Sequence, residues 1–482
     1  MKRSTSGAGD GRGARPTAHE LARYEALFAA RTRGMKSSAM REMMALTERT
    51  DVISLAGGLP DTSTFAPELY AKLMSSVAAE STARALQYGP TEGMESTVEC
   101  IVEVMAAEGT IIDPGEVIVT TGGQQVIDLV CKTFIDPGDV IVAEAPTYPG
   151  AVPTFSAYQA EVEQIEMDGD GMPIDALEAV LDRLQTEGRR PKFIYTIPNF
   201  HNPGGVTMSL ARRRRLVEVA RERELLVLED NPYGLLRYEG EPLPTLYSLD
   251  AQAVGRGGTS DLVIYLGTFS KILSPGLRLG WAVAPRAVLE KLNLGKQGAD
   301  LCSSPMTQLF VAAYFSDRDW RDYLETLKSL YRRRRDVMLE ALEEHFGGRA
   351  SWTRPEGGLF IWATLAGDVD TTDLLARSEG VAFVPGRAAY TDGRSGSSSM
   401  RLNFAGVADD DIRTGVRRIG EALGGQAGLF GALSGSSGGG AKNADASPEP
   451  EQHGTVQEPG LADILHLPLR QDEGHSRRRR DR

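Results

Sequence analysis

The chain has 482 residues, enough for two or three domains with sizeable cores, and its 41% apolar and 25% charged residues are typical of a soluble globular enzyme. The net charge of −13 argues against nucleic acid and anionic membranes as partners, because an acidic surface repels phosphate groups. Cys100, Cys131 and Cys302 lie far apart without a CxxC motif, which favours a reducing compartment and no structural metal. We therefore expect a cytoplasmic protein without a metal site.

Both ends of the chain have compositions typical of disorder. Residues 1–34 form a Gly/Ser/Arg-rich arm that we expect to be largely disordered. No aromatic residue follows Phe430, and the C-terminal segment contains SGSSGGG, a Pro/Glu stretch and four consecutive arginines. Such a segment cannot bury enough apolar area to offset the entropy lost on ordering, so we predict a disordered tail over residues 425–482.

Between these ends, apolar strands alternate with amphipathic helices. The predicted strands are continuous apolar runs bounded by turns, typical of a parallel sheet covered by helices on both faces. They comprise residues 117–120, 140–144, 192–197, 225–230, 262–267 and 278–284, with a helix over 209–223. We therefore predict an α/β fold with a doubly wound, mostly parallel sheet over residues 76–304, in which ligands bind at the carboxyl ends of the strands.

A second, smaller α+β domain is predicted over residues 305–424. A long amphipathic helix over 320–346 precedes short strands at 360–365, 381–385 and 400–404. No repeat of fixed period is present in the sequence, which excludes a solenoid.

Two charged residues stand where predicted central strands end. Lys271 lies in GTFSKILSPGLRLGW, where desolvation and the nearby Arg278 would lower the pKa of its amine and favour a Schiff-base nucleophile. Asp230 ends LLVLED and, if buried, needs a cationic partner such as a protonated pyridine nitrogen. Taken singly, each also fits a plainer interpretation: a lysine at a strand–loop junction, and a turn-forming aspartate.

Three further positions could bind a ligand. The turn with Gly123 and Gln124 leaves backbone N–H groups exposed at a helix N-terminus, an anion site, and has neither the P-loop nor the Rossmann pattern. Asn202, in NFHNPGG, has an amide that could donate to a ligand oxygen, whereas the adjacent His201 is expected to point away and has no assigned role. Arg401 could bind a carboxylate with both guanidinium N–H groups, or form an ordinary surface ion pair.

In this order, the motifs resemble fold type I pyridoxal-phosphate-dependent aminotransferases, in the class I/II branch that contains 2-aminoadipate and kynurenine aminotransferases. The likeness extends from about residue 35 to residue 424. The motifs are SLAGGLPD (54–61), QYGPTEG (87–93), TTGGQQ (120–125), EAPTY (144–148), NFHNPGG (199–205), EDNPYG (229–234), GTFSKILSPGLRLGW (267–281) and MRLNF (400–404). The sequence departs from the family pattern at Gly204, where many relatives have threonine. We expect glycine to loosen this turn while leaving Asn202 available to bind a ligand.

The resemblance implies an enzyme that uses pyridoxal 5′-phosphate to move an amino group from an L-amino acid to a 2-oxo acid, with 2-oxoglutarate the expected acceptor. It also implies a homodimer with active sites at the interface. Residues 35–75 would form an N-terminal segment packed against the small domain and the partner. No nucleic acid or membrane partner is expected.

The family's catalytic roles apply to five matching positions. Lys271 would form the Schiff base with the cofactor and then act as general base and acid. Asp230 would pair with the pyridinium nitrogen and keep the ring an electron sink. Tyr233 and Asn202 would hydrogen-bond the phenolic oxygen, and Tyr148 would stack on the ring.

The remaining roles concern the phosphate and the substrate. Tyr88 would reach the phosphate of the partner subunit's cofactor. Arg401 would bind the substrate α-carboxylate, assisted by Asn202, and Gly58 would lie in a mobile segment over the substrate. The groups expected at the phosphate of the chain's own cofactor are Gly123, Gln124, Ser270, Arg278 and Thr268.

Two alternatives remain open at this stage. The same cofactor could support β-elimination, decarboxylation or oxidation of an amino acid in place of transfer. An aminotransferase-like domain could also serve as a cofactor-binding sensor behind a winged-helix module, but only residues 1–34 precede the likeness, whereas a folded module of that kind needs about 60 residues.

Overall fold

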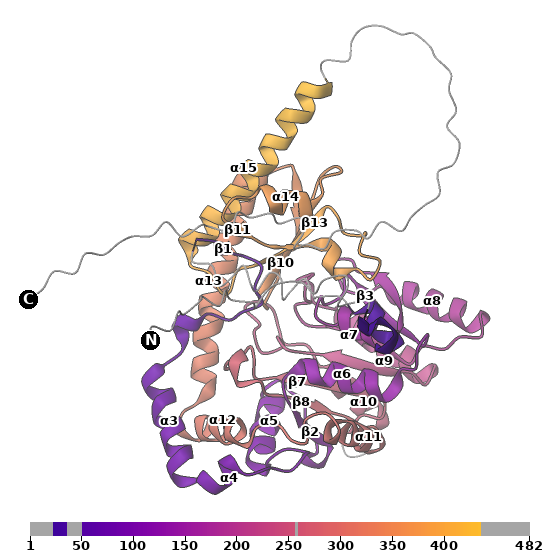
Figure 1. The fold of residues 1–482 in the computed structure, drawn as a ribbon, viewed down its shortest axis with the longest axis vertical. Helices are drawn as coiled ribbons and strands as arrows, with labels where there is room; N and C mark the ends of the chain where they lie inside the picture. The colour runs from indigo at the N-terminus through magenta and orange to yellow at the C-terminus, as the bar shows by residue number, and fades with distance from the viewer. Residues whose placement is uncertain (1–22, 36–50, 256–258, 435–482) are drawn as a thin grey trace, which may run out of the picture.

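The computed structural model describes residues 23–35, 51–255 and 259–434 (Figure 1). The predicted disorder of residues 1–22 and of residues 435–482 lies outside the described residues. Within the predicted arm, the structure has two short 3-10 helices, η1 (Glu25–Leu27) and η2 (Ala30–Gly34). No helix of the described residues is long and apolar enough to cross a membrane.

A seven-stranded sheet forms the centre of the larger part, in the order β2-β8-β7-β6-β5-β3-β4. Every pair is parallel except those made by β8, which is antiparallel to both neighbours. The predicted strands are confirmed to within two residues at each end, and β4 is an additional edge strand whose alternating charges hid it from the sequence pattern. The strands are β2 (Val117–Thr120), β3 (Val140–Ala145), β4 (Glu161–Glu166), β5 (Phe193–Thr196), β6 (Leu226–Asp230), β7 (Val263–Thr268) and β8 (Gly280–Val283).

Helices cover both faces of this sheet, which confirms the doubly wound α/β prediction. One face packs against α6 (Gly123–Phe134), α7 (Val152–Ala157) and α11 (Arg286–Gln297) in one apolar cluster, and the other face packs in the larger cluster. Side chains alternate along each strand, so Tyr195 of β5 lies on the α6 face while Ile194 lies on the opposite one. The remaining helices of this part are α3 (Pro67–Glu80), α4 (Thr82–Leu86), α5 (Glu95–Ala107), α8 (Ile174–Thr186), α9 (Leu210–Glu222), α10 (Leu246–Val254) and α12 (Pro305–Asp317).

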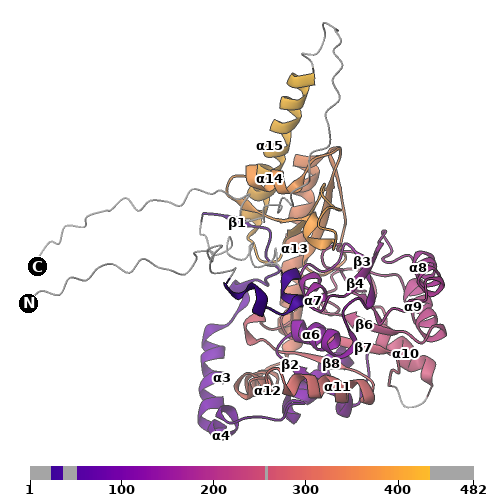
Figure 2. The same cartoon turned by 45° about the vertical axis from the view of Figure 1, so that its right-hand side comes forward.

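A four-stranded antiparallel sheet in the order β12-β13-β10-β9 forms the smaller part. The long helix α13 (Trp320–Phe346) begins beside α12 and reaches this sheet, as both ribbon views show (Figures 1 and 2). Its bounds agree with the predicted helix. The strands and the other helices are β9 (Ala350–Trp352), β10 (Phe360–Leu365), β11 (Val381–Ala382), β12 (Val384–Pro385), β13 (Ser399–Asn403), α14 (Thr371–Arg377) and α15 (Asp409–Ser434).

Two features of this smaller part differ from the predictions or extend them. The N-terminal strand β1 (Ile53–Ser54) pairs in parallel with β11 in a separate two-stranded sheet, so the segment before α3 is attached to the smaller part. Helix α15 continues to Ser434, although we expected disorder from residue 425. Residues 425–434 include three glycines, so intrinsic helix propensity does not account for the longer helix.

Candidate active site

A cavity of about 560 Å³ lies where the central strands end and α6 begins. Its walls come from three parts of the chain: the large sheet, the segment with Gly58 and Leu59, and Arg401 of β13. Every predicted site residue except Tyr88 lines it. These residues are Gly58, Gly123, Gln124, Tyr148, Asn202, Asp230, Tyr233, Thr268, Ser270, Lys271, Arg278 and Arg401.

The amine of Lys271 projects into the cavity from the turn after β7. Its Nζ donates a hydrogen bond to the carbonyl oxygen of Gly58 at 2.6 Å. Burial, together with the positive charges of Arg401 and Arg278, lowers the pKa of Lys271 to about 8, and Asp230 partly opposes this shift. The neutral amine is therefore accessible near physiological pH, as a nucleophilic lysine requires.

Asp230 ends β6, and its carboxylate is held by a residue that the sequence analysis missed. The hydroxyl of Tyr195 donates to Oδ2 of Asp230 at 2.6 Å. Burial raises the pKa of Asp230, the Tyr195 hydrogen bond and the nearby His201 partly oppose this shift, and the resulting pKa is about 6. Tyr195 is paired with Leu228 in the β5–β6 register, two residues before Asp230, so both side chains lie on the same face. The alternation in KFIYTI could have indicated this face, but not the partner strand.

The turn between β2 and α6 depends on the glycine at its centre. Gly122 has φ +79°, and a Cβ there would lie 2.4 Å from Nη2 of Arg278. A side chain at this position would therefore displace the Arg278 guanidinium. The side-chain amide of Gln124 points away from the turn and donates to the carbonyl oxygen of Gly150 at 3.0 Å. Gln124 therefore offers its backbone N–H rather than its side chain to an anion at the helix N-terminus.

Two hydroxyl groups, one from the last residue of β7 and one from the turn after it, also line the cavity. Oγ of Ser270 lies 2.9 Å from Oγ1 of Thr268, which accepts a hydrogen bond from the Ser270 backbone N–H at 3.1 Å. The Thr268 hydroxyl also lies 3.0 Å from the carbonyl oxygen of Leu279. These contacts fix the Ser270 hydroxyl in the cavity lining, to which Arg278 also belongs.

Arg401 is fully buried, which overturns the alternative of a surface ion pair. Its Nη1 donates to Oδ1 of Asn202 at 3.0 Å, its Nη2 donates to the carbonyl oxygen of Ala56 at 2.6 Å, and its guanidinium lies 4.3 Å from the ring centre of Phe360. Burial lowers its pKa to about 10, so it remains a cation at neutral pH. Asn202 in turn places its Nδ2 3.4 Å from the hydroxyl of Tyr233.

His201 is buried but is not among the residues that line the cavity. Its Nε2 lies 3.2 Å from Oε2 of Glu144, and its Nδ1 accepts from the backbone N–H of Gly204 at 3.1 Å. A Cβ on Gly204 would lie 3.0 Å from Cε of Met167 and 3.1 Å from Nδ1 of His201. Glycine at this position therefore accommodates the histidine, and Asn202 still lines the cavity.

Tyr88 lies outside the cavity of its own chain, with 79% of its surface exposed. It belongs to the loop between α4 and α5. No cluster of His, Cys, Asp and Glu that could hold a metal ion occurs within residues 23–35, 51–255 and 259–434.

Comparison with known proteins identifies the family. The sequence pattern of the family described as aminotransferase class I and II matches residues 50–419. Aromatic-amino-acid aminotransferase 1 of Thermococcus litoralis is 43% identical over 403 residues, 83% of this chain and 94% of the relative. The solved multiple substrate aminotransferase of Thermococcus profundus has a TM-score of 0.78 at 39% identity, covering 84% of this chain and 99% of that one. The α-aminoadipate aminotransferase of Thermus thermophilus, complexed with N-(5′-phosphopyridoxyl)-L-leucine, has a TM-score of 0.77 at 36% identity with the same coverage.

The fold is that of the type I pyridoxal-phosphate enzymes, which confirms the resemblance drawn from the motifs. The chain belongs to the class I and II aminotransferases. It is a pyridoxal-phosphate-dependent enzyme that transfers amino groups.

The chemistry of the cavity fits this cofactor. The turn at Gly122 brings the backbone close to the Arg278 guanidinium, and helix α6 begins directly after it. An arginine beside the N-terminus of a helix suits a phosphate group. A buried carboxylate suits a protonated ring nitrogen, and an amine with a lowered pKa suits an aldehyde.

Proposed function

We propose that this enzyme transfers the amino group of an L-amino acid to 2-oxoglutarate in the cavity between the two sheets, by a ping-pong route. The observation that carries the proposal is the set of charges lining one cavity: the Lys271 amine, the Asp230 carboxylate and the Arg401 guanidinium. These groups supply a nucleophile, a counterion for a cationic ring and a binding group for a carboxylate. The names of the relatives support aromatic amino acids and 2-aminoadipate as the first donors to test.

The cofactor would be held by groups at opposite ends of the cavity. When bound, pyridoxal 5′-phosphate supplies a ring that withdraws electrons and so stabilises negative charge at the substrate α-carbon. Asp230 would pair with the ring nitrogen, and the hydrogen bond from Tyr195 would keep its carboxylate ionised and oriented. Tyr233 and Asn202 would contact the phenolic oxygen, and Tyr148 would stack on the ring. The phosphate would be bound by Gly123, the backbone of Gln124, Thr268, Ser270 and Arg278.

Lys271 would perform the proton transfers. Its amine would remove the proton from the substrate α-carbon and later donate a proton back. A pKa of about 8 is suited to this, because the amine can both accept and donate a proton near neutral pH. Asp230 must remain ionised during these steps, and its hydrogen bond from Tyr195 favours the ionised form.

The substrate would lie between the N-terminal segment and β13. Arg401 would bind the α-carboxylate with Asn202 beside it, and Gly58 would close over the substrate. Tyr88 would reach the cofactor phosphate of the partner in a homodimer; its high exposure supports a role outside its own chain. We further propose a cytoplasmic location and a division into an N-terminal segment (35–75), a large domain (76–304) and a small domain (305–424).

A half-reaction screen tests this proposal. Purified holoenzyme is mixed with single amino acids, and loss of the absorbance of the lysine-bound cofactor is followed. Each responding amino acid is then incubated with and without 2-oxoglutarate. Transfer requires the acceptor for more than one cycle, whereas elimination, decarboxylation and oxidation release ammonia, carbon dioxide or peroxide without it. Lys271→Ala should lose both the lysine-bound absorbance and transfer; a retained lysine-bound signal would exclude the assigned role.

A further inference from the structure

A fully buried lysine, Lys296, is connected through Asp300 to the turn between β2 and α6. Lys296, near the end of α11, has no exposed surface, and its Nζ donates to Oδ1 of Asp300 at 2.6 Å. A buried ammonium is costly unless it is paired, so this pair is a defined feature of the fold. The proposed catalytic steps use neither residue.

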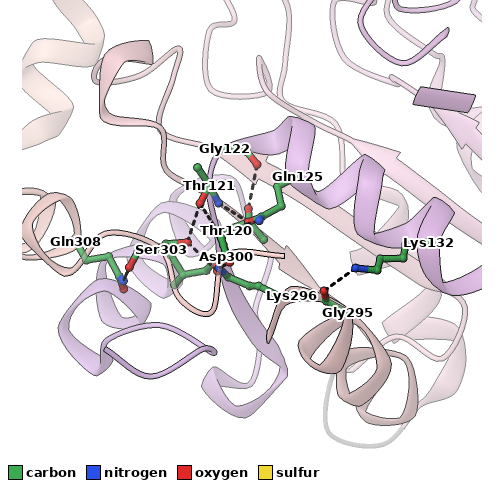
Figure 3. Close-up of polar contacts among 11 residues, drawn as sticks. Thr120, Thr121, Gly122, Gln125, Lys132, Gly295, Lys296, Asp300, Ser303 and Gln308 are labelled. Carbon is green, nitrogen blue, oxygen red and sulfur yellow. Dashed lines mark hydrogen bonds and ion pairs between the residues drawn. The ribbon is translucent and has the colours of Figure 1, made fainter. Parts of the chain in front are cut away.

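Asp300 accepts hydrogen bonds from both ends of the turn. Its Oδ2 accepts from Oγ1 of Thr121 at 2.7 Å and from Nε2 of Gln125 at 2.8 Å. Gln125 also accepts from the backbone N–H of Thr121 at 2.7 Å, which closes the turn on itself. Figure 3 shows these side chains around Asp300. Burial alone would raise the pKa of Asp300, but these hydrogen bonds and the Lys296 ammonium hold it below its ordinary value.

The segment that carries Asp300 is itself fixed to the sheet and to α12. The hydroxyl of Ser303 donates to the carbonyl oxygen of Val119 in β2 at 3.4 Å. Nε2 of Gln308 donates to the carbonyl oxygen of Ser303 at 2.9 Å, and both residues are labelled in Figure 3. Oε1 of Gln308 accepts from the backbone N–H of Met94 at 2.7 Å. The carboxylate of Asp300 is therefore held in place, and it hydrogen-bonds the side chains at both ends of the turn, Thr121 and Gln125.

We propose that Asp300, with Lys296 as its buried counterion, is a positioning residue for the cofactor phosphate: it fixes the turn between Thr121 and Gln125 so that the N–H groups at the start of α6 are arranged before the phosphate binds. This inference rests on the proposed function, which places the phosphate there. In this arrangement Lys296 neutralises the charge of Asp300. An unpaired carboxylate behind an anion site would repel the phosphate, and the ammonium cancels that charge.

The test compares cofactors with and without the phosphate. Dissociation constants for pyridoxal 5′-phosphate and for pyridoxal are measured by spectral titration for the wild type, Thr121→Val and Asp300→Asn. Loss of a hydrogen bond to a charged group predicts about tenfold weaker binding of pyridoxal 5′-phosphate. Pyridoxal should bind all three proteins alike, because it has no phosphate to be positioned. Asp317→Asn, which removes the charge from the exposed Lys72–Asp317 pair, is the matched control and should change neither constant.

The variants keep the test informative if one of them fails to fold. Asp300→Asn leaves a buried ammonium unpaired, so the double variant Lys296→Met/Asp300→Asn removes both charges, and Thr121→Val changes only an exposed residue. Circular dichroism and Tm identify the folded variants. Unchanged affinity for pyridoxal 5′-phosphate in Thr121→Val and in a folded Asp300 variant would overturn the inference, as would equal weakening for both ligands. A wild-type protein that binds no pyridoxal 5′-phosphate would instead overturn the proposed function.

Discussion

The hydroxyl of Tyr195 and the carboxylate of Asp230 lie 2.6 Å apart on neighbouring parallel strands of the central sheet. Both side chains are buried, so the hydrogen bond acts in a medium of low dielectric constant and strongly favours the ionised carboxylate. It also fixes one oxygen of Asp230, which leaves the other free to face the cavity. The charge and orientation of Asp230 therefore depend on a residue outside the cavity lining.

Tyr195→Phe should raise the pKa of Asp230 above its value of about 6, because the lost hydrogen bond stabilised the ionised form. The proposed chemistry needs the ionised form. The acid limb of the pH–activity profile of the variant should therefore lie at a higher pH than that of the wild type. The maximal rate should drop about tenfold or more. The pH profile of kcat/KM, measured with the best amino donor, checks this. Tyr158→Phe removes a comparable hydrogen bond to Asp128 and should leave the profile in place.

Gly122→Ala should weaken binding of pyridoxal 5′-phosphate, since the added methyl group would lie 2.4 Å from the Arg278 guanidinium. We expect a loss of about tenfold or more in affinity, together with about 1 kcal/mol of stability from the positive φ. Gly138→Ala is the matched control: its φ is +89°, and a Cβ there meets nothing within 4 Å. Equal cofactor affinity in the two variants would show that Arg278 does not depend on the space at Gly122.

Arg401→Lys should raise KM for the amino acid about 100-fold, because a lysine cannot present two parallel N–H donors to a carboxylate. The substitution also removes the contact between the guanidinium and the Phe360 ring. Steady-state kinetics over a series of amino donors provide the measurement. Arg413→Lys, at an exposed ion pair with Glu340, should leave KM unchanged. A variant that keeps the wild-type KM would exclude Arg401 from carboxylate binding.

The rate at which the apoprotein captures pyridoxal 5′-phosphate should rise as the pH increases to about 8 and then level off. Only the neutral amine of Lys271 is nucleophilic, and its pKa is lowered from 10.5 to about 8. Below this value, the neutral fraction falls about tenfold per pH unit. Stopped-flow absorbance measurements across this range test the expectation. A rate that continues to rise toward pH 10.5 would show an ordinary, solvated lysine.

Much of the fold and site could be predicted from local patterns. Continuous apolar runs predicted the central strands, because a strand buried on both faces has no polar side to display. Lys271 and Asp230 stood out because they lie at the carboxyl ends of such runs, where ligands bind in sheets of this kind. The Gly122–Gly123 turn was visible because backbone geometry of this kind requires glycine.

The sequence by itself determined the central strands, the glycine turn and the charged residues at the strand ends, because these depend on neighbours a few positions away. Only the tertiary structure decided that Tyr195 holds Asp230, that Arg401 is buried beside Asn202, and that Asp300 ties both ends of the turn before α6. These contacts join residues that are distant in the chain. Strand order and helix packing bring them together, and no local pattern encodes which distant side chain will satisfy a buried charge.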